Sequence, residues 1–276
     1  MTAIAVTIAG SDSSGGAGIQ ADLKTFAALG VYGASAITAL TAQNTRGVNA
    51  IYDVPADFIA AQIDAIFSDL AVDAVKIGML SRTATIETVA AGLTRHHAKN
   101  IVLDPVMVAS SGDALLVREA IDALRTLLIP RALVVTPNLP EAAALTGASL
   151  ARNEREMATQ AREILALGPR AVLIKGGHAT NFGDGDESVD LLIGEGEVVR
   201  LSAKRIATKN THGTGCTLSS AIAAGLAQGR DLISAVQQAK AYVTAAIAAA
   251  DQLKIGRNPD LGHGPLHHFH AQWRNQ

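Results

Sequence analysis

Short apolar runs rich in β-branched residues alternate along the chain with longer segments whose apolar residues recur every three or four positions. The short runs predict buried strands at Ala3 to Ala9, Ala74 to Ile77, Ile101 to Leu103, Leu133 to Val135 and Ala171 to Ile174. The longer segments predict helices at Ile19 to Leu29, Phe58 to Leu70, Ile86 to Arg95, Leu115 to Leu128, Arg155 to Leu167 and Leu218 to Ala227. Such alternation is typical of a mostly parallel sheet covered by helices on both faces. We therefore predict a three-layer α/β/α fold and a single domain over residues 1–276.

Two strand-rich segments do not follow this alternation. Val31 to Tyr52 has strand-rich composition without an obvious crossover helix, and we expect it to form a small flap beside the first strand. Ser188 to Ile193 and Val198 to Ser202 flank a Gly-Glu-Gly-Glu turn and predict a hairpin at a sheet edge. Both segments suit a lid or an oligomer contact, because both lie outside the predicted strand-helix repeat.

Composition and charge narrow the class of protein. With 276 residues and 49% hydrophobic content the chain can bury a large core, and 3% aromatic content with abundant alanine predicts close packing between small helix faces. A net charge of −2 without basic blocks makes nucleic acid an improbable partner. One cysteine excludes an internal disulfide and fits a reducing compartment. We find no signal-peptide pattern and no apolar run of about 18 residues, so we expect a cytoplasmic protein without a membrane span.

The residues that follow each predicted strand define a candidate site, because ligands of open α/β sheets bind beyond the carboxyl ends of the strands. The candidates at these positions are Gly10 to Gly18 with Asp22, Gln43 with Asn44, Gly78 with Met79, Asp104 to Val106, Thr136 to Glu141, and Lys175 to Gly177. Carboxylates, a carboxamide, a lysine and glycines at one sheet edge suit phosphoryl transfer, in which positioning and charge neutralisation supply most of the catalysis.

The segment Asn210 to Thr217 is the most distinctive loop, because its glycines lead directly into a predicted helix. Unpaired N–H groups and the positive end of the helix dipole make such a helix start a favourable site for a phosphate. The only cysteine, Cys216, lies there, and we expect the dipole to lower the pKa of its thiol. Cys216 is therefore a candidate base next to a candidate anion site.

Most of these residues also have a structural interpretation. Asp22 near a helix start could simply favour the dipole, and Asn138 with Glu141 matches a capping-box pattern. Lys175 could be a strand-end charge, and Asp104 before a proline could end a strand. The sequence alone leaves both interpretations open.

Known nucleotide and metal motifs are absent from the sequence. It contains no Walker A loop, and Gly213-x-Gly215 lacks the third glycine and the position of a dinucleotide fingerprint, which disfavours hydride transfer. Four histidines near the C-terminus have no cysteine partner and match no metal-binding spacing; they are His263, His267, His268 and His270.

Several sequence blocks together carry a family resemblance. They are Ala9 to Thr25, Ala42 to Thr45, Lys76 to Leu80, Thr136 to Glu141, Lys175 to His178 and Asn210 to Thr217. With these blocks the chain closely resembles the hydroxymethylpyrimidine/phosphomethylpyrimidine kinases of thiamine biosynthesis, in the ribokinase-like superfamily. The resemblance extends from the first strand to the C-terminal histidines.

The resemblance implies a reaction and a set of site residues. It implies ATP-dependent phosphorylation of 4-amino-5-hydroxymethyl-2-methylpyrimidine, first to the monophosphate and then to the diphosphate. It implies an anion hole at Gly213 and Gly215 with Cys216 as base. The other implied residues are Lys175, Asn138, Thr208 and Thr214 for the nucleotide, Glu141 and Asp104 for Mg²⁺ bound mostly through water, and Gln43, Asp22, Gly10, Met79 and Val106 for the pyrimidine.

Two alternative functions remain open at this point. A pyridoxal kinase on the same scaffold would share Lys175, Cys216 and the anion hole. A ligand-binding sensor could keep the pocket without catalysis, although it would have no need of a base. The resemblance also implies a homodimer, for which the strand-rich segment Val31 to Tyr52 is a candidate contact.

Overall fold

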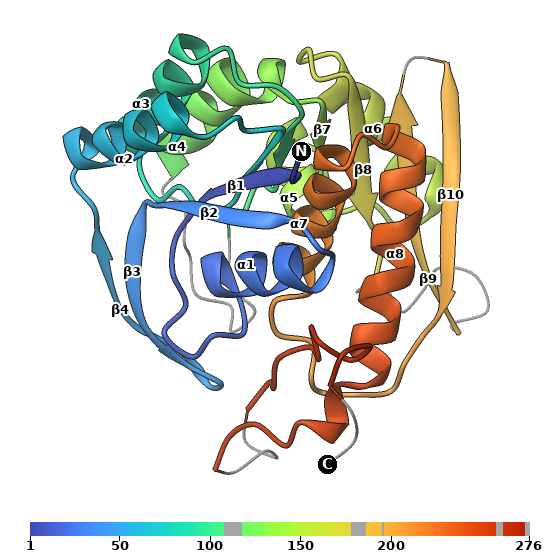
Figure 1. Cartoon of the computed structure of the whole chain (residues 1–276). Helices are drawn as coiled ribbons and strands as arrows, with labels where there is room; N and C mark the ends of the chain where they lie inside the picture. The colour runs from blue at the N-terminus through green and yellow to red at the C-terminus, as the bar shows by residue number, and fades with distance from the viewer. Residues whose placement is uncertain (108–117, 178–185, 195, 258–261, 274–276) are drawn as a thin grey trace.

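The computed structural model describes residues 1–107, 118–177, 186–194, 196–257 and 262–273. In this part of the chain, eight strands form one sheet: β1 (Ile4–Ala9), β2 (Tyr32–Ile37), β5 (Ala74–Ile77), β6 (Ile101–Leu103), β7 (Val134–Val135), β8 (Ala171–Lys175), β9 (Glu187–Gly194) and β10 (Glu197–Lys204). Their order across the sheet is β10-β9-β8-β7-β6-β5-β1-β2. Two further strands, β3 (Ala39–Asn44) and β4 (Gly47–Asp53), form a separate antiparallel pair, seen beyond β2 in Figure 1.

The sheet is parallel except at one edge, as the sequence predicts. Ala5 of β1 lies opposite Gly33 of β2 on one side and Ala74 of β5 on the other, both in parallel register. Strand β9 runs antiparallel to β8 and to β10. The inner parallel strands β1, β5 and β6 are short and almost entirely buried because helices cover both of their faces, whereas the edge strand β2 is mostly half-buried.

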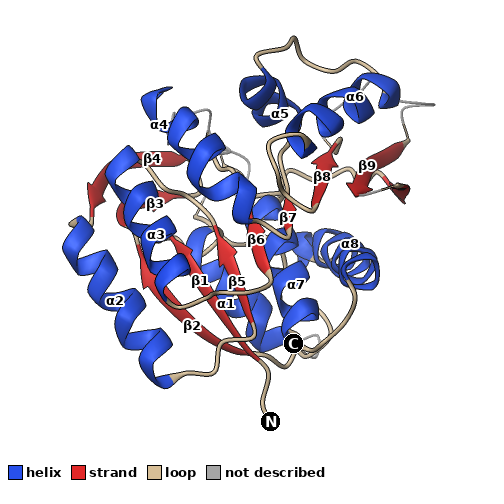
Figure 2. Ribbon diagram, turned by 90° about the horizontal axis from the view of Figure 1, so that it is seen from above, coloured by secondary structure: helices blue, strands red, loops and turns tan. Residues whose placement is uncertain are grey.

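Helices form a layer on each face of the sheet, which completes the predicted three-layer fold (Figures 1 and 2). One layer contains α1 (Gly18–Ala28), α7 (Thr214–Ala227) and α8 (Leu232–Ala248). The other layer contains α2 (Ala56–Asp69), α3 (Thr83–Arg95), α4 (Arg118–Ala123), α5 (Leu139–Thr146) and α6 (Glu154–Leu165). A π-helical segment, Leu124–Leu128, and a 3₁₀ turn, Ile129–Arg131, continue α4, and another 3₁₀ turn, Ala250–Gln252, follows α8.

Helix α7 is packed between the sheet and its neighbours through small side chains. It is buried from Thr217 to Ala227, and a Cβ at Gly225 would lie 2.9 Å from Cβ of Ala235 in α8. A larger residue at Gly225 would push the two helices apart. The alanine-rich composition therefore has the predicted effect of close helix packing.

The predicted flap is smaller than the sequence analysis indicates. Tyr32–Ile37 forms β2, which pairs in parallel with β1, and α1 is the crossover helix between them. Only β3 and β4 stand apart from the main sheet. The prediction that the whole segment lies outside the strand-helix repeat is therefore wrong, because α1 was not connected with the strand that follows it.

The other predictions of elements agree with the structure, apart from the boundaries and two helices. The edge hairpin is present as β9 and β10, with Glu195 of its turn outside the described residues. Residues 115–117 of the predicted helix Leu115 to Leu128 and His178 also lie outside them. Neither α5 nor α8 is among the predicted helices, although the capping-box pattern of Asn138 and Glu141 marks the start of α5; the alanines of α8 give its apolar pattern little contrast. Among the helices of the described residues, none is long and apolar enough to cross a membrane.

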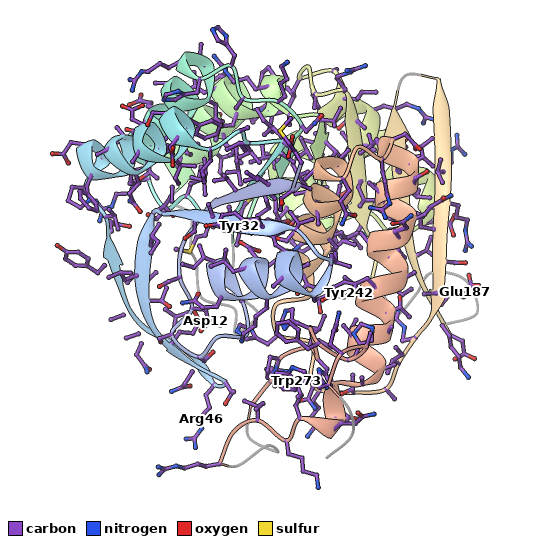
Figure 3. The ribbon with its side chains drawn as sticks, in the orientation of Figure 1. Asp12, Tyr32, Arg46, Glu187, Tyr242 and Trp273 are labelled. Atoms are coloured by element: carbon purple, nitrogen blue, oxygen red, sulfur yellow. The ribbon has the colours of Figure 1, made fainter. Side chains whose placement is uncertain are left out.

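The C-terminal segment packs against α8 and α7 through histidines. His268 is 4% exposed, its Nε2 lies 3.0 Å from Oγ1 of Thr217, and the Tyr242 hydroxyl donates to its carbonyl oxygen. Tyr242 and Trp273 mark this contact in Figure 3. Burial lowers the pKa of His268 to about 4, so the ring is neutral at pH 7 and packs as part of the core.

We predict that Ile63→Ala destabilises the protein by about 2–5 kcal/mol. Ile63 of α2 is fully buried and contacts α3, where a Cβ at Gly92 would lie 2.9 Å from its Cγ2. Phe58→Ala on the same helix is the matched control, because Phe58 is 61% exposed and we expect a change within about 1 kcal/mol. Urea unfolding of both variants measures the two losses, and equal losses would contradict the assignment of the buried face.

Candidate active site

Three charged side chains from different strand ends meet at the carboxyl edge of the sheet. Nζ of Lys175, the last residue of β8, donates to Oδ1 of Asp104 at 2.8 Å and lies 3.8 Å from Oε2 of Glu141. Asp104 directly follows β6, is 1% exposed, and also accepts a hydrogen bond from the Thr136 hydroxyl at 3.0 Å. The predicted convergence of a lysine and two carboxylates is therefore present in the structure.

Glu141 is brought to this cluster by the start of α5. Asn138 caps the helix: its Oδ1 accepts from the Glu141 N–H at 2.9 Å, and its own N–H donates to Oε2 of Glu141 at 2.8 Å. These two bonds form the complete capping box that the sequence pattern allows. The capping interpretation is thus correct, and the cap is also what holds the carboxylate 3.8 Å from Lys175.

Burial and neighbouring charges set the ionisation of this cluster. Burial, together with repulsion from Asp104, raises the pKa of Glu141 to about 7 despite the opposing effect of Lys175. For Asp104, burial would raise the pKa, but Lys175 and then Lys76 outweigh it and lower the pKa below its ordinary value. Asp104 is therefore an anion at neutral pH, while Glu141 can gain or lose a proton near pH 7.

The predicted anion loop adjoins the same cluster. Gly213 has a φ of +84°, and a Cβ there would overlap the carbonyl oxygen of Gly16. A Cβ at Gly215 would lie 3.3 Å from Nζ of Lys175 and 3.5 Å from Oδ2 of Asp104. Within the described residues, no protein acceptor bonds to the N–H groups of Gly215 or Cys216 in the first turn of α7. These groups can receive an anion beside Lys175.

The expectation of a lowered thiol pKa at Cys216 is wrong. Burial raises the pKa of Cys216 to about 11; the Lys76 ammonium opposes this effect, and the carboxylates of Asp22 and Asp104 reinforce it. The N–H of Gly18 faces the sulfur and favours the thiolate only weakly by comparison. The helix start does not lower the pKa because desolvation of the half-buried thiol destabilises the thiolate more than the dipole stabilises it.

A buried ion pair that the sequence analysis missed lies next to the cysteine. Nζ of Lys76 is 2.8 Å from Oδ2 of Asp22, and neither side chain is exposed. The hydroxyls of Thr7 and Ser220 each donate to the Asp22 carboxylate at 2.6 Å. A lysine in the middle of the apolar strand β5 is the signal that could have revealed the pair, because a buried ammonium needs an anionic partner.

These contacts change the interpretation of Asp22. Asp22 is the fifth residue of α1 and lies outside its first turn, where the dipole acts most strongly. Its carboxylate is fully buried and is bonded to Thr7, Lys76 and Ser220, so it has no oxygen facing an open pocket. The family resemblance implies that Asp22 contacts the substrate directly, but its buried and fully bonded carboxylate does not offer such a contact. Asp22 instead pairs with Lys76, whose ammonium interacts electrostatically with Cys216.

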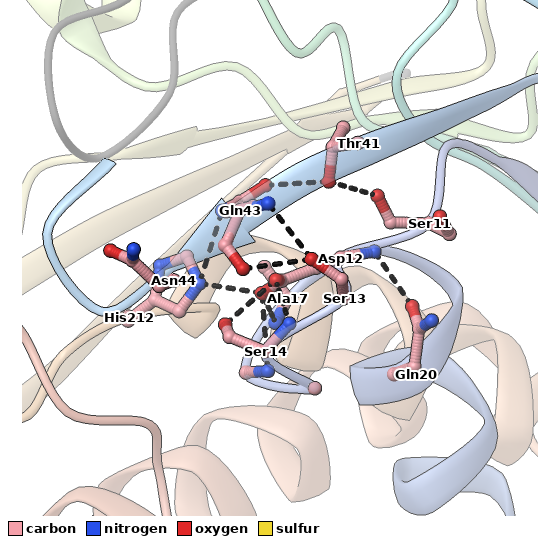
Figure 4. Close-up of polar contacts among 12 residues, drawn as sticks. Ser11, Asp12, Ser13, Ser14, Ala17, Gln20, Thr41, Gln43, Asn44 and His212 are labelled. Atoms are coloured by element: carbon pink, nitrogen blue, oxygen red, sulfur yellow. Dashed lines mark hydrogen bonds and ion pairs between the residues drawn. The ribbon is translucent and has the colours of Figure 1, made fainter. Parts of the chain in front are cut away.

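The residues expected to contact the pyrimidine come from the first loop, the flap and the strand ends. A Cβ at Gly10 would lie 2.5 Å from Cε of Met79, so the methionine side chain covers that glycine. Gln43 is half-buried and lies within β3, not after it as predicted; its amide contacts Thr41 and His212 (Figure 4). Val106 is half-buried, and its N–H donates to the Asp104 carbonyl at 2.8 Å.

The two threonines assigned to the nucleotide differ in position. The Thr214 hydroxyl donates to the Thr211 carbonyl at 2.7 Å, inside the anion loop. The Thr208 hydroxyl donates instead to Oδ1 of Asp251 at 2.5 Å, and among the described residues no hydrogen bond or ion pair joins Thr208 to Lys175, Asp104 or Glu141. The structure therefore brings Thr214, but not Thr208, into the anion loop.

Asp12 lies inside the candidate stretch Gly10 to Gly18, but no role of its own was predicted for it. Its carboxylate accepts the N–H groups of Ser14, Gly16 and Ala17, which folds the first glycine-rich loop around it, and it pairs with His212 at 2.8 Å. Burial opposes ionisation, but His212 and Ser14 outweigh it and lower the pKa of Asp12 well below its usual range. An aspartate inside a run of Ser and Gly is the signal that the sequence offered.

The donor set fits Mg²⁺ only as a partly hydrated ion. In the described part of the chain, no group of three or more His, Cys, Asp or Glu residues could hold a metal. Asp104 and Glu141 supply two carboxylates, and Lys175 already neutralises part of their charge. Mg²⁺ keeps several waters and commonly takes only one or two protein carboxylates with substrate phosphates, so this pair fits the ion without forming a closed cage.

Comparison with known proteins agrees with this geometry. The family model described as phosphomethylpyrimidine kinase matches residues 12–267. The chain belongs to the phosphomethylpyrimidine kinase family. A hydroxymethylpyrimidine/phosphomethylpyrimidine kinase from Rhizobium meliloti is 62% identical over 275 residues, covering 100% of both chains. The family makes the chain a kinase, as the sequence resemblance implies.

Solved structures of kinases share the fold. Phosphomethylpyrimidine kinase from Clostridium difficile superimposes with a TM-score of 0.78 at 48% identity, covering 88% of this chain and 99% of that one. An ADP complex of Bacillus subtilis pyridoxal kinase superimposes with a TM-score of 0.86 at 38% identity, covering 97% and 98%. The scaffold of this family is therefore shared with pyridoxal kinases.

We predict that Glu141 makes the protein less stable as pH rises from about 4.5 to 7. The pKa of Glu141 is raised from 4.5 to about 7 in the folded chain, so folding keeps a proton that the unfolded chain releases. Stability from this group is complete below pH 4.5 and is lost as pH rises through 7, by up to about 3 kcal/mol. Glu141→Gln keeps the cap but does not titrate in this pH range. Because only the wild type loses stability as pH rises, the free energy of unfolding of the variant relative to the wild type should increase between pH 4.5 and 8 in urea unfolding. A constant difference would contradict the raised pKa.

Proposed function

We propose that this chain transfers the γ-phosphoryl group of ATP to 4-amino-5-hydroxymethyl-2-methylpyrimidine and then to the resulting monophosphate, giving the diphosphate used in thiamine biosynthesis. The observation that carries the proposal is the meeting of Lys175, Asp104 and Glu141 with the N–H groups at the start of α7. Membership of the phosphomethylpyrimidine kinase family supports the choice of substrate.

In the first phosphorylation the hydroxymethyl oxygen attacks the γ-phosphorus, and the bond between that phosphorus and ADP breaks. The alcohol proton passes to the Cys216 thiolate, which we propose as the base. Negative charge that develops on the transferring group is stabilised by Lys175 and by the N–H groups of Gly215 and Cys216. Because the pKa of Cys216 is about 11, its thiolate is a strong base that is present in a small fraction at neutral pH.

The second phosphorylation differs in its nucleophile. A phosphomonoester has a second pKa of about 6 and is already ionised at neutral pH. Its oxygen attacks the γ-phosphorus of a second ATP without giving up a proton. Cys216 is therefore needed for the first step and is dispensable as a base for the second.

The nucleotide and metal roles follow the same arrangement. We propose that Lys175 and the loop containing Thr214 contact the phosphates, with Asn138 and Thr208 completing the nucleotide site. Glu141 and Asp104 would hold Mg²⁺ through water, and the ion when bound neutralises phosphate charge. The loss of a proton from Glu141 near pH 7 suits this role, because a cation favours the ionised carboxylate.

On the substrate side, Gln43, Gly10, Met79 and Val106 form the proposed pyrimidine pocket. The Gln43 carboxamide both donates and accepts, so it can pair with a ring nitrogen and the exocyclic amine beside it. Gly10 and Met79 would supply a flat apolar surface for the ring, since the methionine already lies against the glycine.

The second candidate activity is phosphorylation of pyridoxal. It is favoured by the superposition with the B. subtilis pyridoxal kinase over almost the whole chain. A sensor without catalysis is less consistent with a buried Lys175, Asp104 and Glu141 cluster beside unpaired helix N–H groups.

We further propose a homodimer in the cytoplasm. The flap exposes apolar side chains that a partner subunit could cover, namely Leu40, Ile51 and Tyr52. The cytoplasmic location rests on the single cysteine in the sequence.

ADP release by the purified protein with MgATP tests the proposed function. The pyrimidine alcohol, its monophosphate and pyridoxal are offered in parallel. We expect turnover of both pyrimidines and weak turnover of pyridoxal. Turnover of pyridoxal alone would replace the substrate and keep the reaction, and no turnover with any acceptor would favour the sensor.

We predict that Cys216→Ala slows the first phosphorylation by at least about 100-fold and leaves the second largely unchanged. In the wild type, the thiolate fraction grows about tenfold per pH unit below its pKa of about 11, so the first step should accelerate from pH 7 to 10 while the second does not. Steady-state kinetics with each acceptor measures both effects. Equal loss in the two steps would make Cys216 a packing residue.

A further inference from the structure

An ion pair outside the phosphate cluster joins the anion loop to the predicted substrate residue on the flap. Asp12 lies in the loop after β1, His212 directly precedes Gly213, and Gln43 lies near the end of β3 (Figure 4). Nε2 of His212 is 2.8 Å from Oδ2 of Asp12 and 3.4 Å from Nε2 of Gln43. Three segments far apart in sequence therefore meet at the His212 ring, which is only 7% exposed.

The chemistry of the pair fixes the role of the ring nitrogen. The Asp12 carboxylate only accepts hydrogen bonds, and the N–H groups of Gly16 and Ala17 already donate to the same Oδ2. Nε2 of His212 must therefore carry a hydrogen and donate. A ring nitrogen that donates cannot accept from the Gln43 NH₂ group, so the Gln43 atom beside it has to be the carbonyl oxygen.

The other end of the amide leads to the same orientation. The Thr41 hydroxyl lies 2.9 Å from the Ser11 carbonyl and 3.1 Å from Oε1 of Gln43, but it has one proton for these two acceptors. A half-turn of the amide exchanges Oε1 and Nε2 and moves no other atom. Thr41 then donates to Ser11 and accepts from the Gln43 NH₂ group, while the Gln43 carbonyl faces His212. In this orientation no two donors face each other, and the Gln43 carbonyl shares the single Nε2–H of His212 with Asp12.

We propose that Asp12 and His212 are positioning residues that orient the Gln43 amide and thereby determine which way round the pyrimidine binds. The inference rests on the proposed function. With the carbonyl on the His212 side, the exocyclic amine of the substrate lies toward His212 and the ring nitrogen lies toward Thr41. The hydroxymethyl group is attached to the ring carbon beyond the amine, so it faces Gly213 and the anion loop.

The C-terminal segment keeps this arrangement in place. The N–H of His212 donates to the Gly264 carbonyl at 3.1 Å, and the N–H of His263 donates to the Thr45 carbonyl at the tip of the flap at 2.9 Å. Gly264 also donates to Oδ1 of Asn210 at 3.0 Å. The flap and the anion loop are therefore tied to one common segment, which limits how far His212 can move from Gln43.

Binding of two substrates by four variants tests the proposal. Titration calorimetry gives Kd for the pyrimidine alcohol and for an analogue in which hydrogen replaces the exocyclic amine. We expect the wild type to prefer the amine at least about tenfold, and His212→Leu and Gln43→Ala to reduce this preference to within about threefold. His212→Gln, which keeps an N–H donor, should retain most of it.

His96→Leu is the matched control, because Nε2 of His96 pairs with Asp64 at 2.7 Å between α3 and α2, away from the site. This variant should keep the wild-type preference. If His212→Leu keeps the wild-type preference for the amine, the proposal is overturned. If His212→Leu does not fold, His212→Gln decides instead, and loss of the preference in that variant would overturn the proposal. If the wild type prefers the amine-bearing pyrimidine but releases no ADP in the kinase assay, the proposed function alone is rejected. If the wild type binds neither compound, or binds both equally, the inference is overturned.

Discussion

The site depends on the close approach of two glycine-containing loops that are 200 residues apart at their Asp12–His212 contact. Gly213 can follow its path only without a side chain, because a Cβ there would overlap the Gly16 carbonyl. Asp12 gathers the N–H groups of the first loop and pairs with His212 of the second. This contact lies where the start of α7 meets the start of α1: Cys216 faces the Gly18 N–H, and Gly215 lies beside Lys175.

Two buried lysine–aspartate pairs give the interior beneath these loops its electrostatic character. Lys76 with Asp22 is fully buried, and Lys175 with Asp104 is largely buried with 15% of the lysine side chain exposed; each pair is completed by threonine or serine hydroxyls. Such pairs persist because each charge would be strongly destabilising without its partner. Their carboxylates also raise the pKa of the Cys216 thiol, which links the stability of the core to the proposed base.

Several groups have both a structural and a chemical role. The Asn138–Glu141 capping box starts α5 and at the same time places a carboxylate of raised pKa beside Lys175. The buried His268 ring closes the C-terminal segment over α7, and Gly264 in that segment supports His212. A structural interpretation of a residue therefore does not exclude a functional one, since the same contacts that stabilise the fold fix the geometry of the site.

The sequence alone determined the strand-helix order, the parallel sheet and the residues at its carboxyl edge, because hydrophobic periodicity and strand-end position depend on local pattern. Lys175, Asp104, Glu141 and the anion loop were all found in this way. Only the tertiary structure decided that Asp22 is buried against Lys76, that β2 joins the main sheet and that burial raises the pKa of Cys216. The roles of Asp12 and His212 also required it. Each of these depends on desolvation or on contacts between distant segments, and neither leaves a periodic signal in the chain.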